Sequence, residues 1–361
     1  MSYDRTIPHE MITEMIQQIE PSWEIRKATP AVDGYHIVYH LDIAMETGRK
    51  QCVLKATPPE MSPTCDDEAR LLAILHAHTS LPVPEVLGSV DEHEHLPTPF
   101  FISSTLSGAN YNRIELSEFS ESAVERLAHS TGRHLATLHE ITVDAYGFVD
   151  VDADETLDGG QPSATVEQLV VQEPTHSWIE YLTDERDRIL TGLDGTRFGD
   201  LCPMVRPVLD AQIDCLSGEF DAVIARIDQS LDNVLLDPET SAVTGLLDWE
   251  FCVAATPAYD LAFVEHSLSG GHWKYLPGVS DHRETIRSAL LDGYREVGLS
   301  RIVEQFHDNC ACYALFADLH TMINFEDWFD QFDAAEVTDE QRKKAATTLR
   351  ERVEEVVNDD L

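Results

Sequence analysis

The fold class of this chain is decided by the stretch Val223-Ile224-Ala225-Arg226-Ile227-Asp228-Gln229-Ser230-Leu231-Asp232-Asn233-Val234-Leu235-Leu236-Asp237. An apolar strand runs into Asp228, and Asn233 follows five residues later, directly before a second apolar run. The next segment, Thr244-Gly245-Leu246-Leu247-Asp248-Trp249-Glu250, again predicts a strand that ends on an acid. The Asp–Asn spacing alone arises often by chance, but a following strand that ends in Asp-Trp makes the pattern specific.

These residues suit phosphoryl transfer. That reaction needs a divalent metal to neutralise phosphate charge and an oxygen acceptor close to the attacking hydroxyl. Asp228 at a strand end fits the acceptor role. Asn233 and Asp248 supply the hard oxygen ligands that Mg²⁺ prefers.

The upstream half of the chain agrees with this interpretation. Lys55 ends an apolar strand, as a phosphate-binding lysine should, and Glu68 begins the next predicted helix, where it could pair with Lys55. Taken alone, Lys55 would be a solvated strand end, since lysine is usually on the surface. Its place in the ordered set with Glu68, Asp228, Asn233 and Asp248 favours the functional interpretation.

Hydrophobic periodicity predicts an α+β chain that is sheet-rich around one central helix in residues 1–105 and mainly helical in residues 106–361, and the length suits two lobes or two domains. In the first lobe we expect helices at 9–19 and 66–77 and strands at 23–28, 34–41, 51–55, 86–90 and 100–104. In the second lobe we expect helices at 121–140, 177–194, 204–217, 281–297, 301–324 and 338–357, with one β island at 222–227, 233–236 and 243–247.

The chain resembles the aminoglycoside phosphotransferase and choline kinase-like family, whose fold is that of protein kinases. The metal-binding Asp is followed by Trp249-Glu250 rather than Phe-Gly, which separates the chain from protein kinases. The resemblance covers about residues 25–270 and rests also on Leu81-Pro82-Val83-Pro84, Pro99 to Gly108, Leu135 to His139 and Pro257-Ala258-Tyr259-Asp260-Leu261-Ala262.

The resemblance implies a bilobal fold, with a small antiparallel-sheet N-lobe and a larger, mainly helical C-lobe. It also implies a kinase that moves the γ-phosphoryl of ATP or GTP to a hydroxyl of a small substrate. Asp228 would orient and deprotonate that hydroxyl, while Mg²⁺ would lie between the phosphates and Asn233 and Asp248. The nucleotide site would be formed by Lys55, Glu68, Gly34 in the phosphate loop, and Ser103 and Ser104 in the strand and hinge where adenine binds.

Two departures from the family pattern stand out. The residue two positions before the catalytic Asp is Arg226 instead of the usual His, and only Gly34 marks the phosphate loop. Family resemblance makes Asp260 the acid that holds the catalytic loop. Because a buried Arg needs an acidic partner, we expect Arg226 to support this loop through an ion pair with Asp260 or, failing that, with Asp248.

The charge balance is far from typical, with 66 acidic against 25 basic residues and a formal net charge of −41. Such a surface repels nucleic acid. The acids are spread along the whole chain, and at molar salt the Debye length falls to about 3 Å, which screens their repulsion. We therefore interpret the acidity as halophilic adaptation, which weakens any inference from acidity to a cationic substrate.

The remaining features point to a cytoplasmic protein with no membrane segment. No apolar run approaches the roughly 18–20 residues of a membrane span, and no apolar stretch follows the N-terminal residues. The seven Cys are odd in number and show no C-x-x-C spacing, which argues against a disulfide framework or zinc site. The sequence leaves the oligomeric state open.

Several alternatives stay open. The acceptor could be an aminoglycoside, an amino alcohol, a sugar or homoserine, and an inactive nucleotide-binding or scaffold protein of the same fold is the main rival to a kinase. We expect His139 to be a packed helix-end residue and Trp249 to be core, whereas Glu250 could reach the metal. We expect core packing, rather than a box for a quaternary ammonium, of Trp273, Tyr275, Trp328 and Phe329.

Overall fold

The computed structural model describes residues 6–31, 36–45, 48–58, 68–111, 113–152, 156–227, 229–331 and 337–359. The chain divides into two compact units, each assembled from several stretches. The first unit contains Met1–Ser107, Asp150–Val170 and Thr244–Phe251. The second unit contains Gly108–Val149, Val171–Val243 and Cys252–Leu361.

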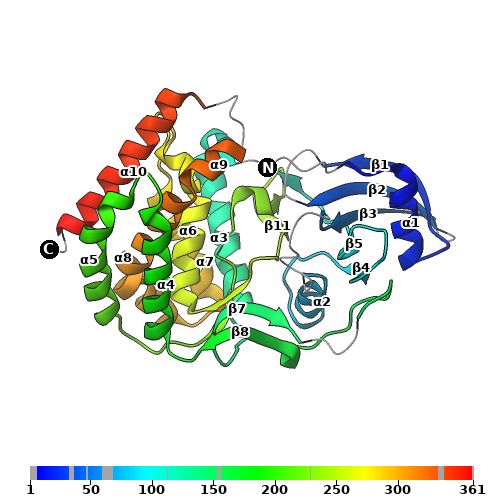
Figure 1. Ribbon diagram of the computed structural model, residues 1–361, viewed down its shortest axis with the longest axis horizontal. Coiled ribbons are helices and arrows are strands. Elements are labelled where there is room, and N and C mark those ends of the chain that lie inside the picture. The colour runs from blue at the N-terminus through cyan, green and yellow to red at the C-terminus, as the bar shows by residue number, and fades with distance from the viewer. Residues whose placement is uncertain are drawn as a thin grey trace. The chain divides into compact units, whose positions relative to one another are not determined.

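The first unit is built on a five-stranded antiparallel sheet with the strand order β1-β2-β3-β5-β4. Its strands are β1 (Glu24–Pro30), β2 (Ile37–Met45), β3 (Gly48–Ala56), β4 (Val86–Val90) and β5 (Phe100–Ser104). From Ile37 to Ile43 every second residue of β2 is buried, and the apolar side chains of helix α1 (His9–Ile19) pack onto the same core. Figure 1 shows α1 beside this sheet. The expected alternation of a half-buried strand is therefore present.

The opposite face of this sheet carries the polar residues of interest. Lys55 lies opposite Phe101 across the β3–β5 pair, and Phe101 lies opposite Ser89 across the β5–β4 pair. Successive side chains of a strand point to opposite faces, so this row faces away from the α1 side. Helix α2 (Glu68–His78) lies against the row and contributes Glu68 to Lys55. The two helices therefore cover the two faces of the sheet.

The second unit is mainly helical. Its helices are α3 (Glu121–Leu138), α4 (Trp178–Asp194), α5 (Cys202–Asp214), α6 (Pro257–Leu268), α7 (Arg283–Val297), α8 (Ser300–Ile323), α9 (Phe325–Gln331) and α10 (Asp339–Asp359). None of the helices that the structure describes combines the length and the apolar character that a membrane crossing requires.

Short strands punctuate the helices. They are β6 (Ala109–Asn110), β7 (Tyr146–Val151), β8 (Leu169–Thr175), β9 (Val223–Ala225), β10 (Val234–Leu236), β11 (Val243–Leu246) and β12 (Val253–Ala255). Strands β6 and β10 pair antiparallel, while β8, β7, β12 and β9 form a four-stranded sheet in that order.

The expectation of a single β island beyond residue 115 was wrong, because β7, β8 and β12 also belong to this region. Helices α6 and α9 were likewise not predicted as elements of their own. Strand β8 is largely exposed on both faces and β12 has only three residues. Neither pattern offers the sustained apolar alternation on which strand prediction depends.

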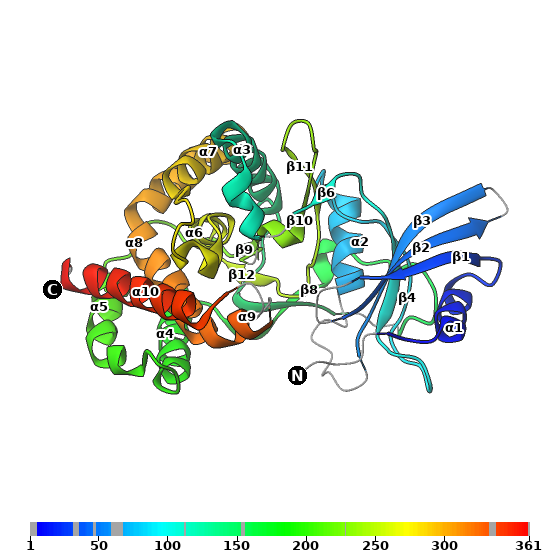
Figure 2. The same ribbon diagram turned by 90° about the horizontal axis from the view of Figure 1, so that it is seen from above.

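Helices α3 and α7 lie side by side (Figure 2). They approach each other closely at two glycines. A Cβ on Gly132 would lie 2.0 Å from the carbonyl oxygen of Leu290, and a Cβ on Gly293 would lie 2.0 Å from that of His129. Each helix thus places a glycine against the backbone of the other. This contact sets the distance of α3 from the helical core.

We predict that Gly132→Ala or Gly293→Ala destabilises the protein by roughly 1–3 kcal/mol, the usual cost of overpacking, because the added methyl group meets backbone rather than a movable side chain. Urea unfolding measures the free-energy difference. Gly195→Ala is the matched control, since a Cβ there would come no closer than 3.8 Å to another residue. Equal stability of the three variants would contradict the close-approach argument.

Candidate active site

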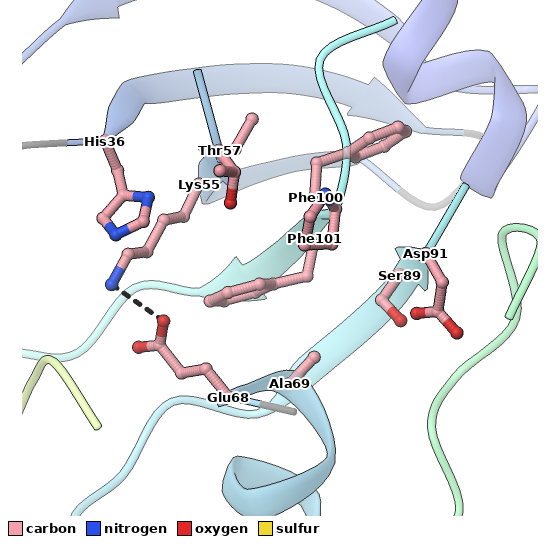
Figure 3. A pocket seen from close by; sticks show the side chains of 11 residues that line it. His36, Lys55, Thr57, Glu68, Ala69, Ser89, Asp91, Phe100 and Phe101 are labelled. Carbon is pink, nitrogen blue, oxygen red and sulfur yellow. Dashed lines mark ion pairs between the residues drawn. The ribbon is translucent and has the colours of Figure 1, made fainter. Parts of the chain in front are cut away.

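The Lys55 ammonium is the centre of a cluster of charges in the first unit. Lys55 Nζ lies 2.7 Å from Glu68 Oε2, 2.8 Å from Asp248 Oδ1 and 3.5 Å from Glu250 Oε2. Glu250 in turn is hydrogen-bonded to His36 Nε2 in a buried pair. Figure 3 shows Lys55 reaching from its strand toward Glu68 at the start of α2. The cluster thus unites β3, α2 and the segment after β11.

The electrostatics of the cluster follow from one cation among three carboxylates. Burial by itself would lower the pKa of Lys55, but Glu68, Asp248 and Glu250 hold it well above its ordinary value. Burial raises the pKa of Glu68, and the neighbouring carboxylates add to this effect against the attraction of Lys55. Lys55 therefore stays charged, and the site keeps an excess of negative charge that a bound cation would relieve.

Asp248 has an unusual backbone conformation. Its φ of 59° lies in the left-handed region, which non-glycine residues adopt uncommonly although Asp and Asn tolerate it best. The next residue, Trp249, donates its backbone N–H to Glu68 Oε1 at 3.2 Å, so α2 also fixes the turn. Such strain is found preferentially at functional sites, and here it turns the Asp248 carboxylate toward Lys55.

The carboxylates fit a divalent cation. Glu68, Asp248 and Glu250 each offer one oxygen, and these atoms lie within 4.8 Å of one another. Hard oxygen donors with excess negative charge are what Mg²⁺ or Ca²⁺ requires. Within the described residues, this donor set therefore suits the metal that the sequence predicts at Asp248.

The predicted catalytic loop lies in the second unit, and Asp228 itself falls outside the described residues, as does Gly34 of the phosphate loop. Around Asp228 the loop is well anchored. Arg226 is only 2% exposed, and its Nη2 donates to the carbonyl oxygen of Asn233 at 3.2 Å. Asn110 of β6 donates to the carbonyl oxygens of Asp232 and Val234. Arg226 therefore closes the loop from one end to the other.

The predicted ion pair between Arg226 and Asp260 was wrong. Asp260 is fully buried near the start of α6, and its Oδ2 instead accepts a hydrogen bond from His139 Nε2 at 2.9 Å. His139 follows α3 and also contacts the Tyr294 hydroxyl through Nδ1 at 3.0 Å. His139 thus occupies one oxygen of Asp260 where the sequence suggested a guanidinium, while Oδ1 of Asp260 has no hydrogen-bond partner among the described residues. The expectation that His139 is a packed helix-end residue is confirmed.

Side chains of helix α3 also contact the predicted catalytic loop. Gln229, next to Asp228 in sequence, donates to the Thr131 hydroxyl at 3.3 Å. His134 lies one turn further along α3, and burial, with Arg133 and then Arg226, lowers its pKa to about 4. His134 is therefore neutral at physiological pH, which lets it lie near the Arg226 cation.

The other predicted residues occupy identifiable places. Ser103 is buried in β5, and Ser104 is tied to Glu85, whose N–H donates to the Ser104 hydroxyl at 3.0 Å. Trp249 is buried as expected and donates its indole N–H to the Leu246 carbonyl oxygen. Trp273, Tyr275 and Phe329 are buried, with Trp273 and Phe329 in edge-to-face contact, which agrees with the expectation of core packing, whereas Trp328 is only half-buried.

Some contributors to the site were not found from the sequence. His36 follows the predicted phosphate loop, but a lone His at a strand start carries no signal of a partner more than 200 residues away. Asn110 lies in a two-residue strand that no periodicity reveals. The only indication in the sequence that Glu250 belongs to the site was its position two residues after the predicted metal ligand Asp248.

Comparison with known proteins agrees with this arrangement. The model of the phosphotransferase enzyme family matches residues 38–301. Among solved structures, a thermostable mutant of aminoglycoside phosphotransferase APH(4)-Ia in complex with ADP and hygromycin B is similar at a TM-score of 0.58 and 14% identity, covering 98% of each chain. The GDP and kanamycin complex of APH(2'')-IIIa is similar at 0.56 and 14% identity, covering 97% of this chain and 99% of that one.

A weaker relation links the chain to a segment of a larger protein. It is 22% identical over 227 residues to the probable acyl-CoA dehydrogenase IBR3 of Arabidopsis thaliana. The match covers 62% of this chain and 26% of that protein, so the chain spans about a quarter of the curated relative it matches.

The family match extends over most of the chain, from the second strand to the start of α8. The chain belongs to the phosphotransferase enzyme family. Its fold is that of the protein kinase-like proteins, with an antiparallel sheet in the N-terminal region and a helical C-terminal region.

We predict that Arg226→Ala lowers the free energy of unfolding by about 1.5–3 kcal/mol, because the loop loses a buried charged hydrogen-bond donor. Arg206→Ala is the control: Arg206 is about half exposed and paired with Asp187, so its loss should cost at most about 1 kcal/mol. Denaturant unfolding of both variants decides the matter. A cost for Arg226→Ala no larger than that of the control would show that Arg226 does not support the loop.

We predict a pH dependence from His134. Its folded pKa of about 4 lies below the ordinary value of about 6.5, so the unfolded state binds more protons between these values and stability falls as the pH drops through this window. His134→Gln should remove this contribution, so that its loss of stability between pH 7 and pH 4.5 is smaller than that of the unmodified protein. Parallel pH profiles for the two proteins would contradict the assignment.

Proposed function

We propose that this chain is a small-molecule kinase that transfers the γ-phosphoryl group of ATP or GTP to a hydroxyl group of a small substrate. The observation that carries the proposal is the Lys55 cluster, in which a strand lysine meets a helix glutamate and a strained Asp248. Kinase-type phosphoryl transfer uses both a lysine that contacts the phosphates and an acid that holds the metal, and this cluster contains a candidate for each.

In this proposal Lys55 binds nucleotide phosphates and Glu68 holds the Lys55 ammonium in place. Asp248, with Asn233, would hold Mg²⁺, whose chemistry is to neutralise charge on the phosphates. Glu250 lies within reach of the same ion. The N-terminal lobe, residues 1–105, would carry the nucleotide, with Ser103 and Ser104 near adenine, and the C-terminal lobe, residues 106–361, would carry the acceptor.

Asp228 would act on the acceptor. Its proposed task is to orient the hydroxyl and take its proton as the bond to phosphorus forms, the usual role of a positioned general base. Arg226 would keep the loop in shape through Asn233, and Asp260 would do so through His139. These two are positioning residues, because neither needs to touch the reacting atoms.

The similar solved structures support nucleotide binding, since they hold ADP or GDP, and they support a polyol acceptor, since they hold hygromycin B or kanamycin. At 14% identity they do not decide the acceptor of this chain, and amino alcohols and sugars remain candidates beside aminoglycosides. The second candidate function is an inactive nucleotide-binding or scaffold protein of the same fold, which the replacement of the usual His by Arg226 leaves open and which the presence of Asp228, Asn233 and Asp248 argues against.

We predict Mg²⁺-dependent ADP or GDP release when the protein meets its acceptor. The test is a panel of aminoglycosides, amino alcohols and sugars with Mg-ATP and Mg-GTP. It is run in molar KCl because we also propose that the acidic surface is a salt adaptation. Peptide substrates serve as a negative control. Nucleotide binding without turnover on any acceptor, together with no basal hydrolysis, would favour the inactive protein.

Two substitutions separate the proposed roles. Asp248→Asn tolerates the left-handed backbone but weakens the metal site, so it should reduce Mg-dependent nucleotide affinity by at least about tenfold. Asp228→Asn should leave nucleotide affinity nearly unchanged and reduce kcat by about 10²–10⁴, the typical contribution of a general base. Equal losses of nucleotide affinity in both variants would show that the roles are assigned wrongly.

A further inference from the structure

A short segment of the first unit extends the sheet beyond β4. Residues 156–160, here called the edge segment, run beside β4 through backbone hydrogen bonds. Asp91 N–H donates to the Leu157 carbonyl at 2.9 Å, Ser89 N–H donates to the Gly160 carbonyl at 3.0 Å, and Gly159 N–H donates to the Ser89 carbonyl at 2.8 Å. The sequence around it is rich in Asp and Gly and predicted an exposed loop or insertion.

The edge segment is fixed on its other side as well. Gly159 has a φ of 93°, and a Cβ at this position would lie 2.0 Å from the carbonyl oxygen of Gln18 in α1. Only glycine fits both the left-handed backbone and this approach. The segment is therefore held between β4 and α1 rather than lying loosely on the surface.

Asp91 joins the edge segment to helix α2. Its Oδ2 accepts the backbone N–H of Leu157 at 2.7 Å and lies 2.5 Å from Nη2 of Arg70. Its Oδ1 lies 3.4 Å from Arg70 Nη1, so both guanidinium nitrogens face the carboxylate. The Arg70 side chain is 7% exposed and that of Asp91 is 16% exposed. A shielded bidentate pair of this kind is directional as well as attractive.

Arg70 and Glu68 fix the first turn of α2 at two points. Residues two apart in a helix lie about 200° apart around its axis. Glu68 is held by Lys55 and by the Trp249 N–H, while Arg70 is held by Asp91. The buried side chains of Leu71, Leu72 and Leu75 pack the helix, and the polar contacts on two sides of its first turn fix its rotation there and therefore the position of the Glu68 carboxylate.

A small cavity lies between the two contacts. It is lined at one end by Lys55 and Glu68 and at the other by Ser89 and Asp91, with Phe101 and Ala69 between them (Figure 3). Its volume of about 20 Å³ admits little more than one water molecule. Within the described chain the buried Ser89 hydroxyl has no hydrogen-bond partner, which a water in this cavity would supply. The packing thus leaves little room for Glu68 to shift independently of Asp91.

We propose that Asp91, together with the edge segment, is a positioning residue for the nucleotide-phosphate site: through Arg70 it sets the rotation of α2 and so holds Glu68 against Lys55. The proposal rests on the proposed function for its effect on nucleotide binding. Its structural component, that Asp91 holds the start of α2, stands on the contacts alone.

The first test uses hydrogen exchange of the α2 backbone amides without nucleotide. Asp91→Ala should exchange these amides at least several-fold faster than the unmodified protein. Asp42→Ala is the matched control, because Asp42 also pairs with an arginine of the first unit, Arg49, but lies on β2 away from α2. Unchanged exchange in Asp91→Ala, or the same acceleration in Asp42→Ala, would overturn the proposal.

The second test is a double-mutant cycle on the dissociation constant for Mg-ATP or Mg-GTP, whichever binds. Asp91→Ala should weaken binding by about tenfold, about 1.4 kcal/mol. In the Glu68→Gln background the same substitution should have little further effect, because Asp91 acts through Glu68. Equal, additive losses in both backgrounds would reduce Asp91 to a general stabilising role and overturn the proposal. If the unmodified protein binds no nucleotide, the proposed function fails, while the exchange experiment still decides whether Asp91 holds α2.

Discussion

The structure of the first unit depends on the Lys55 ammonium, which has to balance the carboxylates of Glu68, Asp248 and Glu250. Like charges this close repel one another, so the group persists only where the surrounding fold holds each member. A strand supplies the cation, a helix supplies one acid, and a strained turn supplies the other two. The site therefore exists only if strand β3, helix α2 and the segment after β11 are packed in their correct relative positions.

The sequence was informative where a function demands a residue type at a fixed place. Lys55 at a strand end and Glu68 at a helix start predicted a pair, and the structure contains it. Asp248 at the end of an apolar run predicted an acid at a strand end, and the structure places it two residues after β11 and 2.8 Å from Lys55. The bounds of α1, β4 and β5 match the prediction, whereas those of β2 and β3 differ from it by up to four residues, because a period-two pattern shows that a strand exists more reliably than where it ends.

The sequence was less informative about contacts between residues that lie far apart in the chain and meet only in the folded protein. Arg226 needed a buried partner, but sequence order could not show that His139 already occupies Asp260 and that the carbonyl of Asn233 is within reach. His36 and Glu250 are likewise far apart in the sequence and form a hydrogen bond only in the folded protein. The edge segment is largely exposed, as expected of a loop, but its pairing with β4 could not be predicted, because backbone hydrogen bonds and a glycine approach require no apolar side chains.

The composition of the first unit from three separate stretches has a practical consequence for anyone who wishes to work with it alone. A fragment that ends after Ser107 would include Lys55 and Glu68 but lack residues 150–170 and 244–251. It would expose the free edge of β4, leave Asp91 without the Leu157 amide, and lose both acids that follow β11. To express the first unit alone, residues 150–170 and 244–251 would have to be joined to residues 1–107 through new linkers.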